Sequence, residues 1–187
     1  MQSTGLPPRY AFRQPVALNV RQKGNSLICS KCGEEHLLEE MELTFRRPDD
    51  AAKLSPEERS RLLQENNDLC VIEGKRFFIR GLLPLSVESR EHPYCIGLWV
   101  EVPQSSFERI YDLWDSDEQL NEPPFEARLA NEIPTSNGSL GLEAELRLTG
   151  PTTRPDVFLK SSTHPLYAEQ ARGIDEHRAS EYTALFA

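Results

Sequence analysis

The chain has 187 residues, of which 38% are hydrophobic, and it carries a formal net charge of −9. This length is sufficient for one ordinary core, so we expect a single domain with a short appendage. The acidic balance argues against binding to nucleic acid or to anionic membranes, because a negative surface repels both. No apolar run approaches the roughly 18 residues that cross a bilayer, and no hydrophobic signal peptide is recognisable, so we expect a cytoplasmic protein.

The first part of the chain differs in composition from the rest. Residues 1–24 contain four basic residues and no acid, so the remainder carries a net charge of −13 (−9 minus +4). Pro7, Pro8 and Pro15 disfavour an amphipathic helix in this segment. We therefore predict a mobile basic tail over residues 1–24 and a single domain over residues 25–187.

The strongest chemical signal is the segment Cys29-Ser-Lys-Cys-Gly-Glu-Glu-His36. Two thiols separated by two residues and followed by Gly33 predict a tight turn in which both sulfurs face one metal ion. The chain has four cysteines and no export signal, which indicates a reducing compartment. In such a compartment a CxxC pair is more often a metal or redox element than a disulfide.

We predict that this turn binds a structural zinc ion. Zinc prefers four tetrahedral ligands and binds thiolate sulfur and imidazole nitrogen well. The chain contains no HExxH motif and no histidine-rich set that would leave a coordination position open for catalysis. His164 is a reserve candidate for the ligand set. The predicted ligands are Cys29, Cys32, His36 and Cys70.

Apolar patterns predict strands through most of the domain. Residues 69–72 and 76–80 flank a short glycine-containing loop, which predicts a hairpin. Residues 125–133 hold a strand or a short turn. The other predicted strands cover residues 26–29, 40–45, 94–102, 140–148 and 157–160.

Capping signals predict four helices, which begin at Ser55, at Ser105 or Ser106, at Pro165 and at Asp175. The second helix has an apolar stripe with the spacing of a core-facing surface. This stripe consists of Phe107, Ile110, Tyr111 and Trp114. Strands joined by short loops, with helices between groups of strands, predict an α+β fold. We expect a mainly antiparallel sheet with helices packed around it and a zinc-knuckle-like turn at its N-terminal end.

Several short segments occur in order along residues 27–178: CxxCGxxH from Cys29, Asp68–Ile72, Phe77–Gly81, Gly97–Val100, Ser106–Arg109, Arg154-Pro155, His164–Leu166, Gln170 and Gly173-Ile174. Together they resemble a bacterial family of uncharacterised proteins, the domain of unknown function family 2199. The resemblance implies a compact bacterial cytoplasmic domain and no known activity. Cys95 lies where this family is expected to have a non-thiol residue, so it is a poor candidate ligand.

Other interpretations compete with a structural zinc site. A redox role of the CxxC pair is disfavoured, because Glu34 and Glu35 follow it and would raise the thiol pKa. Cys70 and His164 could form a nucleophile–base pair, but a cysteine in an apolar run usually packs in the core. The acidic stretch, residues 112–126, could dock a basic partner or be a solvated loop.

We therefore expect a binding or interaction module that contains structural zinc and has a protein partner of basic character. One alternative is a metal- or cysteine-dependent enzyme. The other is an acidic, immunity-type protein that neutralises its partner. Arg80 could anchor an anion, although an ion pair with one of the many acids is the commoner outcome.

Overall fold

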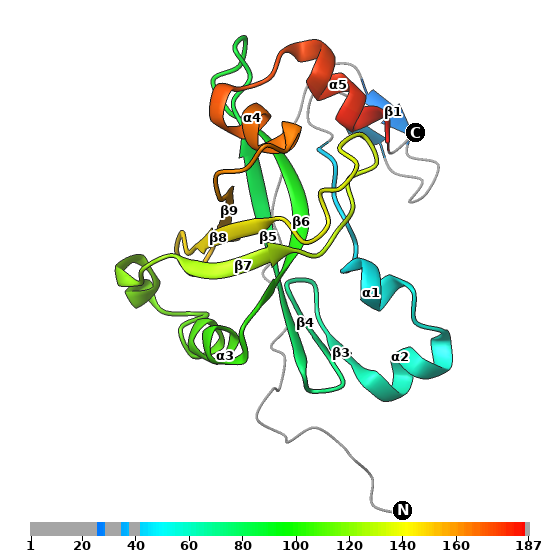
Figure 1. The fold of residues 1–187 in the computed structure, drawn as a ribbon, viewed down its shortest axis with the longest axis vertical. Coiled ribbons are helices and arrows are strands. Elements are labelled where there is room, and N and C mark those ends of the chain that lie inside the picture. Colours follow the sequence, from blue (N-terminus) through cyan, green and yellow to red (C-terminus); the bar gives the residue numbers. More distant parts are fainter. Residues whose placement is uncertain (1–25, 29–34, 38–41, 186–187) are drawn as a thin grey trace, which may run out of the picture.

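The computed structural model describes residues 26–28, 35–37 and 42–185 (Figure 1). The predicted tail lies outside these residues, as do Cys29 and Cys32. The described chain contains groups of strands separated by helices, which confirms the predicted α+β class. In chain order the elements are β1 (Ser26–Ile28), β2 (Glu35–Leu37), α1 (Asp49–Ala52), α2 (Pro56–Leu62), β3 (Leu63–Glu65), β4 (Leu69–Ile72), β5 (Arg76–Leu85), β6 (Tyr94–Val102), α3 (Gln104–Asp112), the 3₁₀ helix η2 (Asp117–Asn121), β7 (Phe125–Leu129), β8 (Glu143–Arg147), β9 (Asp156–Leu159), α4 (Pro165–Arg172) and α5 (Glu176–Ala184).

Seven strands form one sheet in the order β3-β4-β5-β6-β7-β8-β9, and β1 and β2 form a separate two-stranded sheet. Neighbouring strands in this order are antiparallel, as predicted. An additional parallel pairing joins β5 to β9, with Leu82 opposite Asp156. This pairing connects the two ends of the run from β5 to β9, so the mixed sheet closes into a small barrel (Figure 1). The sequence patterns did not predict this closure.

The barrel closes at a glycine. A Cβ atom at Gly81 would lie 2.6 Å from Cγ2 of Val157 and 3.0 Å from the carbonyl oxygen of Pro155. The backbone N–H of Leu82 donates a hydrogen bond to the same oxygen at 2.9 Å. Glycine at position 81 therefore allows the β9 backbone to approach β5 closely.

Alternate side chains of the barrel strands form one apolar core. On β5 these are Phe77, Ile79, Leu83 and Leu85. Phe107 of α3 packs against them, with its ring centroid 5.2 Å from that of Phe77. The helices α4 and α5 lie at the opposite end of the molecule from α3 (Figure 1) and contribute Leu166, Ala179 and Tyr182. Each leucine, isoleucine or phenylalanine of this core contributes about 1.5–3 kcal/mol when it is fully buried.

A smaller apolar cluster lies on the other face of β4, β5 and β6. Its largest side chains are Phe78 and Trp99, both 0% exposed. The remaining members are Ala51, Cys70, Ile72 and Ala130. The buried side chain of Asn131 ties this region together, because its Oδ1 accepts from the N–H of Trp99 at 2.8 Å and its Nδ2 donates to the carbonyl of Arg47 at 2.8 Å.

Most predicted helix starts are confirmed. At α2 the N–H of Glu58 donates to Oγ of Ser55 at 3.2 Å and the N–H of Ser55 donates to the Glu58 carboxylate at 2.8 Å, which completes the capping box. Helix α5 begins after Asp175 as expected. The predicted start of α3 at Ser105 or Ser106 is wrong, because Pro103, directly after β6, already turns the chain into the helix. In the described part of the chain, the helices are too short or too polar to cross a bilayer.

The strand predicted over residues 40–45 is only partly present. From residue 42 onward the segment forms a single parallel bridge, between Thr44 and Gly97 of β6. The N–H of Gly97 donates to the carbonyl of Leu43 at 2.8 Å, and the N–H of Phe45 donates to the carbonyl of Gly97 at 2.7 Å. The segment therefore covers part of the edge of β6, which β7 pairs only near Val100.

Replacing Gly81 with Ala should destabilise the domain by about 1–3 kcal/mol, because the new methyl group overpacks the contact between β5 and β9. Denaturant unfolding followed by circular dichroism measures this loss. In the double variant Gly81→Ala/Val157→Ala the cost should be less than the sum of the two single changes, because Cγ2 of Val157 is the atom nearest the added methyl group. Fully additive costs would contradict a close contact at this point.

Candidate functional site

The N-terminal hairpin is the candidate metal site. Strands β1 and β2 pair antiparallel, with Leu27 opposite His36 and Ile28 opposite Glu35. Residues 29–34, which connect the two strands and contain both cysteines of the CxxC pair, lie outside the described residues. For His36 the structure gives the backbone position alone. Zinc binding by this segment therefore stays a prediction.

Cys70, the predicted fourth ligand, is fully buried. It lies on β4 opposite Phe78 and belongs to the smaller apolar cluster. Burial, reinforced by the nearby charge of Glu65, raises the pKa of the Cys70 thiol to about 12. The thiol is therefore protonated at neutral pH. Among the residues that the structure describes, no three His, Cys, Asp or Glu side chains are grouped so that they could hold a metal ion.

His164 has a structural role at the start of α4. Its Nδ1 accepts a hydrogen bond from the N–H of Leu166 at 3.1 Å, so it is the N-cap of the helix. Because Nδ1 accepts, the proton lies on Nε2, which can donate to the carbonyl of Asn137 at 3.0 Å. The structure does not bring His164 together with Cys70, whose neighbours are Phe78, Trp99 and other apolar side chains.

Cys95 is a half-buried thiol on β6. Burial, together with the charges of Glu42 and Asp156, raises its pKa to about 12. The Glu42 carboxylate accepts a hydrogen bond from the N–H of Cys95 at 2.7 Å, and burial raises the pKa of Glu42. Like Cys70, this thiol is protonated at neutral pH, and it is therefore a weak nucleophile.

The acidic stretch after α3 is an ordered structure that contains the 3₁₀ helix η2. Ser116 accepts from the N–H of Glu118 at 3.2 Å at the start of this helix. The buried side chain of Gln119 donates to the carbonyls of Leu113 at 2.9 Å and Trp114 at 2.7 Å. Leu120 is 64% exposed among these acids. The stretch thus exposes one large apolar side chain in a segment rich in acids, of which Glu122 is paired with Arg109.

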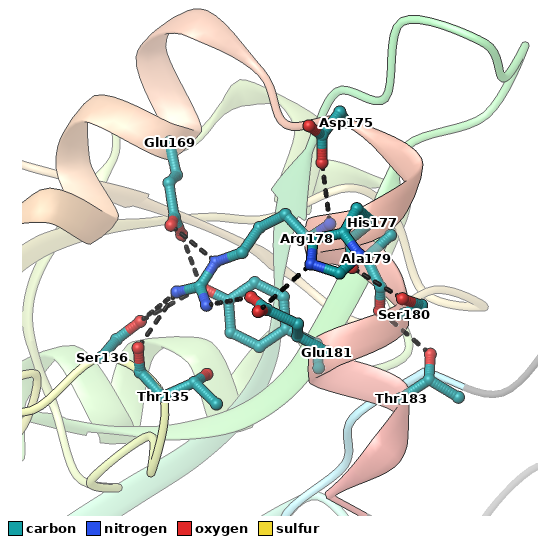
Figure 2. Close-up of polar contacts among 11 residues, drawn as sticks. Thr135, Ser136, Glu169, Asp175, His177, Arg178, Ala179, Ser180, Glu181 and Thr183 are labelled. Atoms are coloured by element: carbon teal, nitrogen blue, oxygen red, sulfur yellow. Dashed lines mark hydrogen bonds and ion pairs between the residues drawn. The ribbon is translucent and has the colours of Figure 1, made fainter.

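A partly buried polar network around Arg178 joins α5 to α4 and to the loop before β8 (Figure 2). The Nε of Arg178 donates to Glu169 at 2.8 Å, its Nη1 to Glu181 at 2.8 Å and its Nη2 to the carbonyl of Thr135 at 3.0 Å. The Tyr182 hydroxyl donates to Glu169 at 2.5 Å, and burial raises its pKa to about 12. Each nitrogen of this guanidinium group has an acceptor. The network therefore holds α4 and α5 together. The sequence did not predict it, because Glu169 and Thr135 are distant from Arg178 along the chain and no motif links them.

Two open pockets on the surface are lined entirely by described residues. One, of about 370 Å³, is lined by residues that include Arg90, Phe158, Tyr167 and Gln170. The other, of about 440 Å³, is lined by charges of both signs. In the second pocket Lys160 pairs with Glu126 at 3.2 Å and Arg128 pairs with Glu143 at 3.4 Å. Because these charges neutralise one another, the pocket has no evident requirement for a charged ligand.

A family model described as "Uncharacterized protein conserved in bacteria (DUF2199)" matches residues 28–174. This range runs from the end of β1 to the residue before the N-cap of α5, and it confirms the family resemblance of the sequence. No curated protein and no solved structure matches the chain.

The unfolding free energy of the wild-type protein should fall as the pH rises from about 9 to about 12. In this range the unfolded chain loses the Cys70 proton while the folded chain keeps it, so ionisation favours unfolding. The variant Cys70→Ala should lose less stability over the same range, as measured by urea unfolding at a series of pH values. Val71→Ala, a neighbouring buried residue that does not titrate, should keep the wild-type slope. Parallel curves for wild type and Cys70→Ala would mean that folding does not raise the pKa of Cys70, which is the behaviour expected of a thiol bound to zinc.

Proposed function

Because the chain belongs to the DUF2199 family of uncharacterized bacterial proteins, we propose that it is a binding module whose N-terminal hairpin is stabilised by a structural zinc ion. The observation that carries this proposal is the two-stranded sheet of β1 and β2, which is separate from the main sheet and has strands of three residues. An isolated hairpin is at best marginally stable in water. A metal cross-link would stabilise such a hairpin, and the CxxC pair lies in the connection between the two strands.

Metal coordination would supply this cross-link. Cys29 is the first residue of the connection and His36 lies within β2, so the candidate ligands are at the two ends of this short segment. The coordination bonds would offset the entropy lost when the loosely tethered segment is closed. Cys29, Cys32 and His36 are the ligands that this argument supports. Cys70 stays in the proposed set as the fourth, although its thiolate would have to form inside an apolar cluster.

A binding role is supported over catalysis by the way the fold uses its reactive groups. The thiols of Cys70 and Cys95 have pKa values of about 12, far from the range of a nucleophile at neutral pH. Both ring nitrogens of His164 have backbone partners. These groups contribute to packing and helix capping and not to a reactive centre. Their use supports binding of a partner over catalysis.

The purified wild-type protein should contain zinc in an equimolar amount, and Cys29→Ser or Cys32→Ser should remove most of it and lower the melting temperature. Mass spectrometric metal analysis and thermal unfolding measure the two effects. Cys95→Ser is the matched control, because this thiol is remote from the hairpin in the sequence and should change neither quantity appreciably. A wild-type protein without zinc, or a Cys95→Ser variant that is the most damaged of the three, would disprove the ligand assignment.

The exposed Leu120 favours a second candidate function, the neutralisation of a basic partner. It is 64% exposed and lies beside the exposed acids Asp117 and Glu118. An apolar centre with a polar rim is the usual anatomy of a protein interface. Hydrogen bonds of the Gln119 and Ser116 side chains to the backbone already order this segment. The segment would therefore lose little conformational entropy when a partner binds.

Reversing the charge of the segment should abolish such binding. The wild-type chain should capture a basic protein from a bacterial lysate at low salt and release it at raised salt. The double variant Asp117→Lys/Glu118→Lys should no longer capture that protein. Glu57→Lys/Glu88→Lys is the control, since it changes the net charge equally at exposed positions elsewhere. Capture that is equal for both variants, or insensitive to salt, would exclude this role.

A further inference from the structure

Two arginines and one aspartate meet where β4, β5 and the start of β9 come together. Asp68 directly precedes β4, and Arg80 lies on β5. The N–H of Arg80 donates to the carbonyl of Asp68 at 2.8 Å, so the two residues are direct cross-strand neighbours. Opposite charges at such positions normally interact with each other. An ion pair between Arg80 and Asp68 is therefore the simple expectation.

The Asp68 carboxylate is instead bonded to Arg154. The Nε of Arg154 donates to Oδ1 of Asp68 at 2.6 Å, and the two side chains are 27% and 16% exposed. Arg154 reaches this position because the next residue, Pro155, accepts the hydrogen bond from Leu82 that closes the barrel. The cluster therefore holds two guanidinium groups and only one carboxylate.

Arg80 is left poorly satisfied. Its Nη1 reaches only the carbonyl of Asn67, at 3.3 Å, and its Nε is buried without an acceptor in the part of the chain that the structure describes. Burial lowers the pKa of Arg80, the neighbouring charge of Arg154 lowers it further, and Asp68 opposes both effects. A buried donor without a partner is unfavourable, because it has lost its hydrogen bonds to water and gained none in the protein.

Arg178 provides an internal comparison. It too is a largely buried arginine, with 22% of its side chain exposed, but its three nitrogens donate to Glu169, Glu181 and the carbonyl of Thr135. The fold can therefore supply acceptors to a buried guanidinium group where one has a purely structural role. At Arg80 the described residues supply no acceptor to Nε, although the full chain has nine more negative than positive charges. Because Nε itself is buried, an added acceptor can reach only the terminal nitrogens of Arg80, where Nη1 has one long hydrogen bond to the carbonyl of Asn67. The terminal nitrogens are therefore the place for a ligand.

We propose that Arg80 and Arg154 bind the carboxylate group of a ligand. The terminal nitrogens of two guanidinium groups can donate together to the two oxygens of a carboxylate, which is a geometry that arginine recognises well. Two guanidinium groups and one carboxylate leave the cluster with a single positive charge. That charge matches a monoanion. A phosphate dianion would leave excess negative charge in a chain that already carries −9. This site is independent of the zinc hairpin.

The proposal is tested by titrating the ¹⁵N-labelled full chain with carboxylates while the Nε–H resonances of Arg80 and Arg154 are monitored. In each lysine variant described below, the resonance of the remaining arginine reports binding. The probes are acetate for a small free acid, N-acetylglycine for a peptide C-terminus and N-acetylglutamate α-amide for an acidic side chain. Inorganic phosphate and chloride at equal ionic strength are the comparison anions. At least one carboxylate should give a saturable shift and bind more tightly than phosphate, and the tightest of the three identifies the source of the group.

Substitution of the two arginines should weaken binding without removing charge. Arg80→Lys and Arg154→Lys keep the positive charge but lose the planar fork, so each should raise the dissociation constant about tenfold or more. Arg109→Lys, on the exposed face of α3 and paired with Glu122, should leave it unchanged. The spectrum of each variant checks that it is folded. If Arg80→Lys does not fold, Arg154→Lys alone tests the proposal. No saturable shift, a shift of equal size with chloride, tighter binding of phosphate, or full affinity in a folded lysine variant would overturn the proposal.

Discussion

The parallel contact between β5 and β9 at Gly81 is the constraint on which the rest of the molecule depends. With no side chain at this position, the Pro155 carbonyl comes within 2.9 Å of the Leu82 nitrogen, and the run of strands from β5 to β9 closes. The C-terminal helices are then attached through Gln170, which donates to the carbonyl of Val157 at 2.8 Å and accepts from the N–H of Leu159 at 2.7 Å. One close backbone approach therefore organises both the barrel and the helices that cover it.

The same closure produces the unusual electrostatics beside it. It carries Arg154 to the Asp68 carboxylate, and Arg80 consequently loses the partner that its own strand neighbour would provide. In the Arg178 network the opposite holds, since carboxylates from both α4 and α5 surround the guanidinium group. The two arginines differ in whether the fold supplies enough acceptors. That difference, and not burial alone, separates a structural clamp from a candidate ligand site.

The chemically reactive side chains of the described domain are committed to structure. Cys70 packs beside Phe78 and Trp99, and His164 begins a helix. The candidate functional sites are therefore the N-terminal hairpin, the acidic segment around Leu120 and the Arg80–Arg154 pair. Of these, the hairpin and the acidic segment were recognisable from the sequence, because CxxC spacing and a run of acids are local features. Arg80 could be named as a candidate anion anchor, but nothing in the sequence linked it to Arg154.

Local chemistry was enough to predict the α+β class, the hairpin of β4 and β5, the bounds of β6 and the capping box of α2, because each depends on residues a few positions apart. The short elements α1 and β3 were missed, since they carry little periodic signal and depend on packing such as that of Ala51 in the smaller cluster. The sequence by itself determined most of the longer elements, the family and the candidate metal ligands. Only the tertiary structure decided how the sheet closes and which arginine takes Asp68, because that pair joins residues 86 positions apart, where spacing along the chain carries no information.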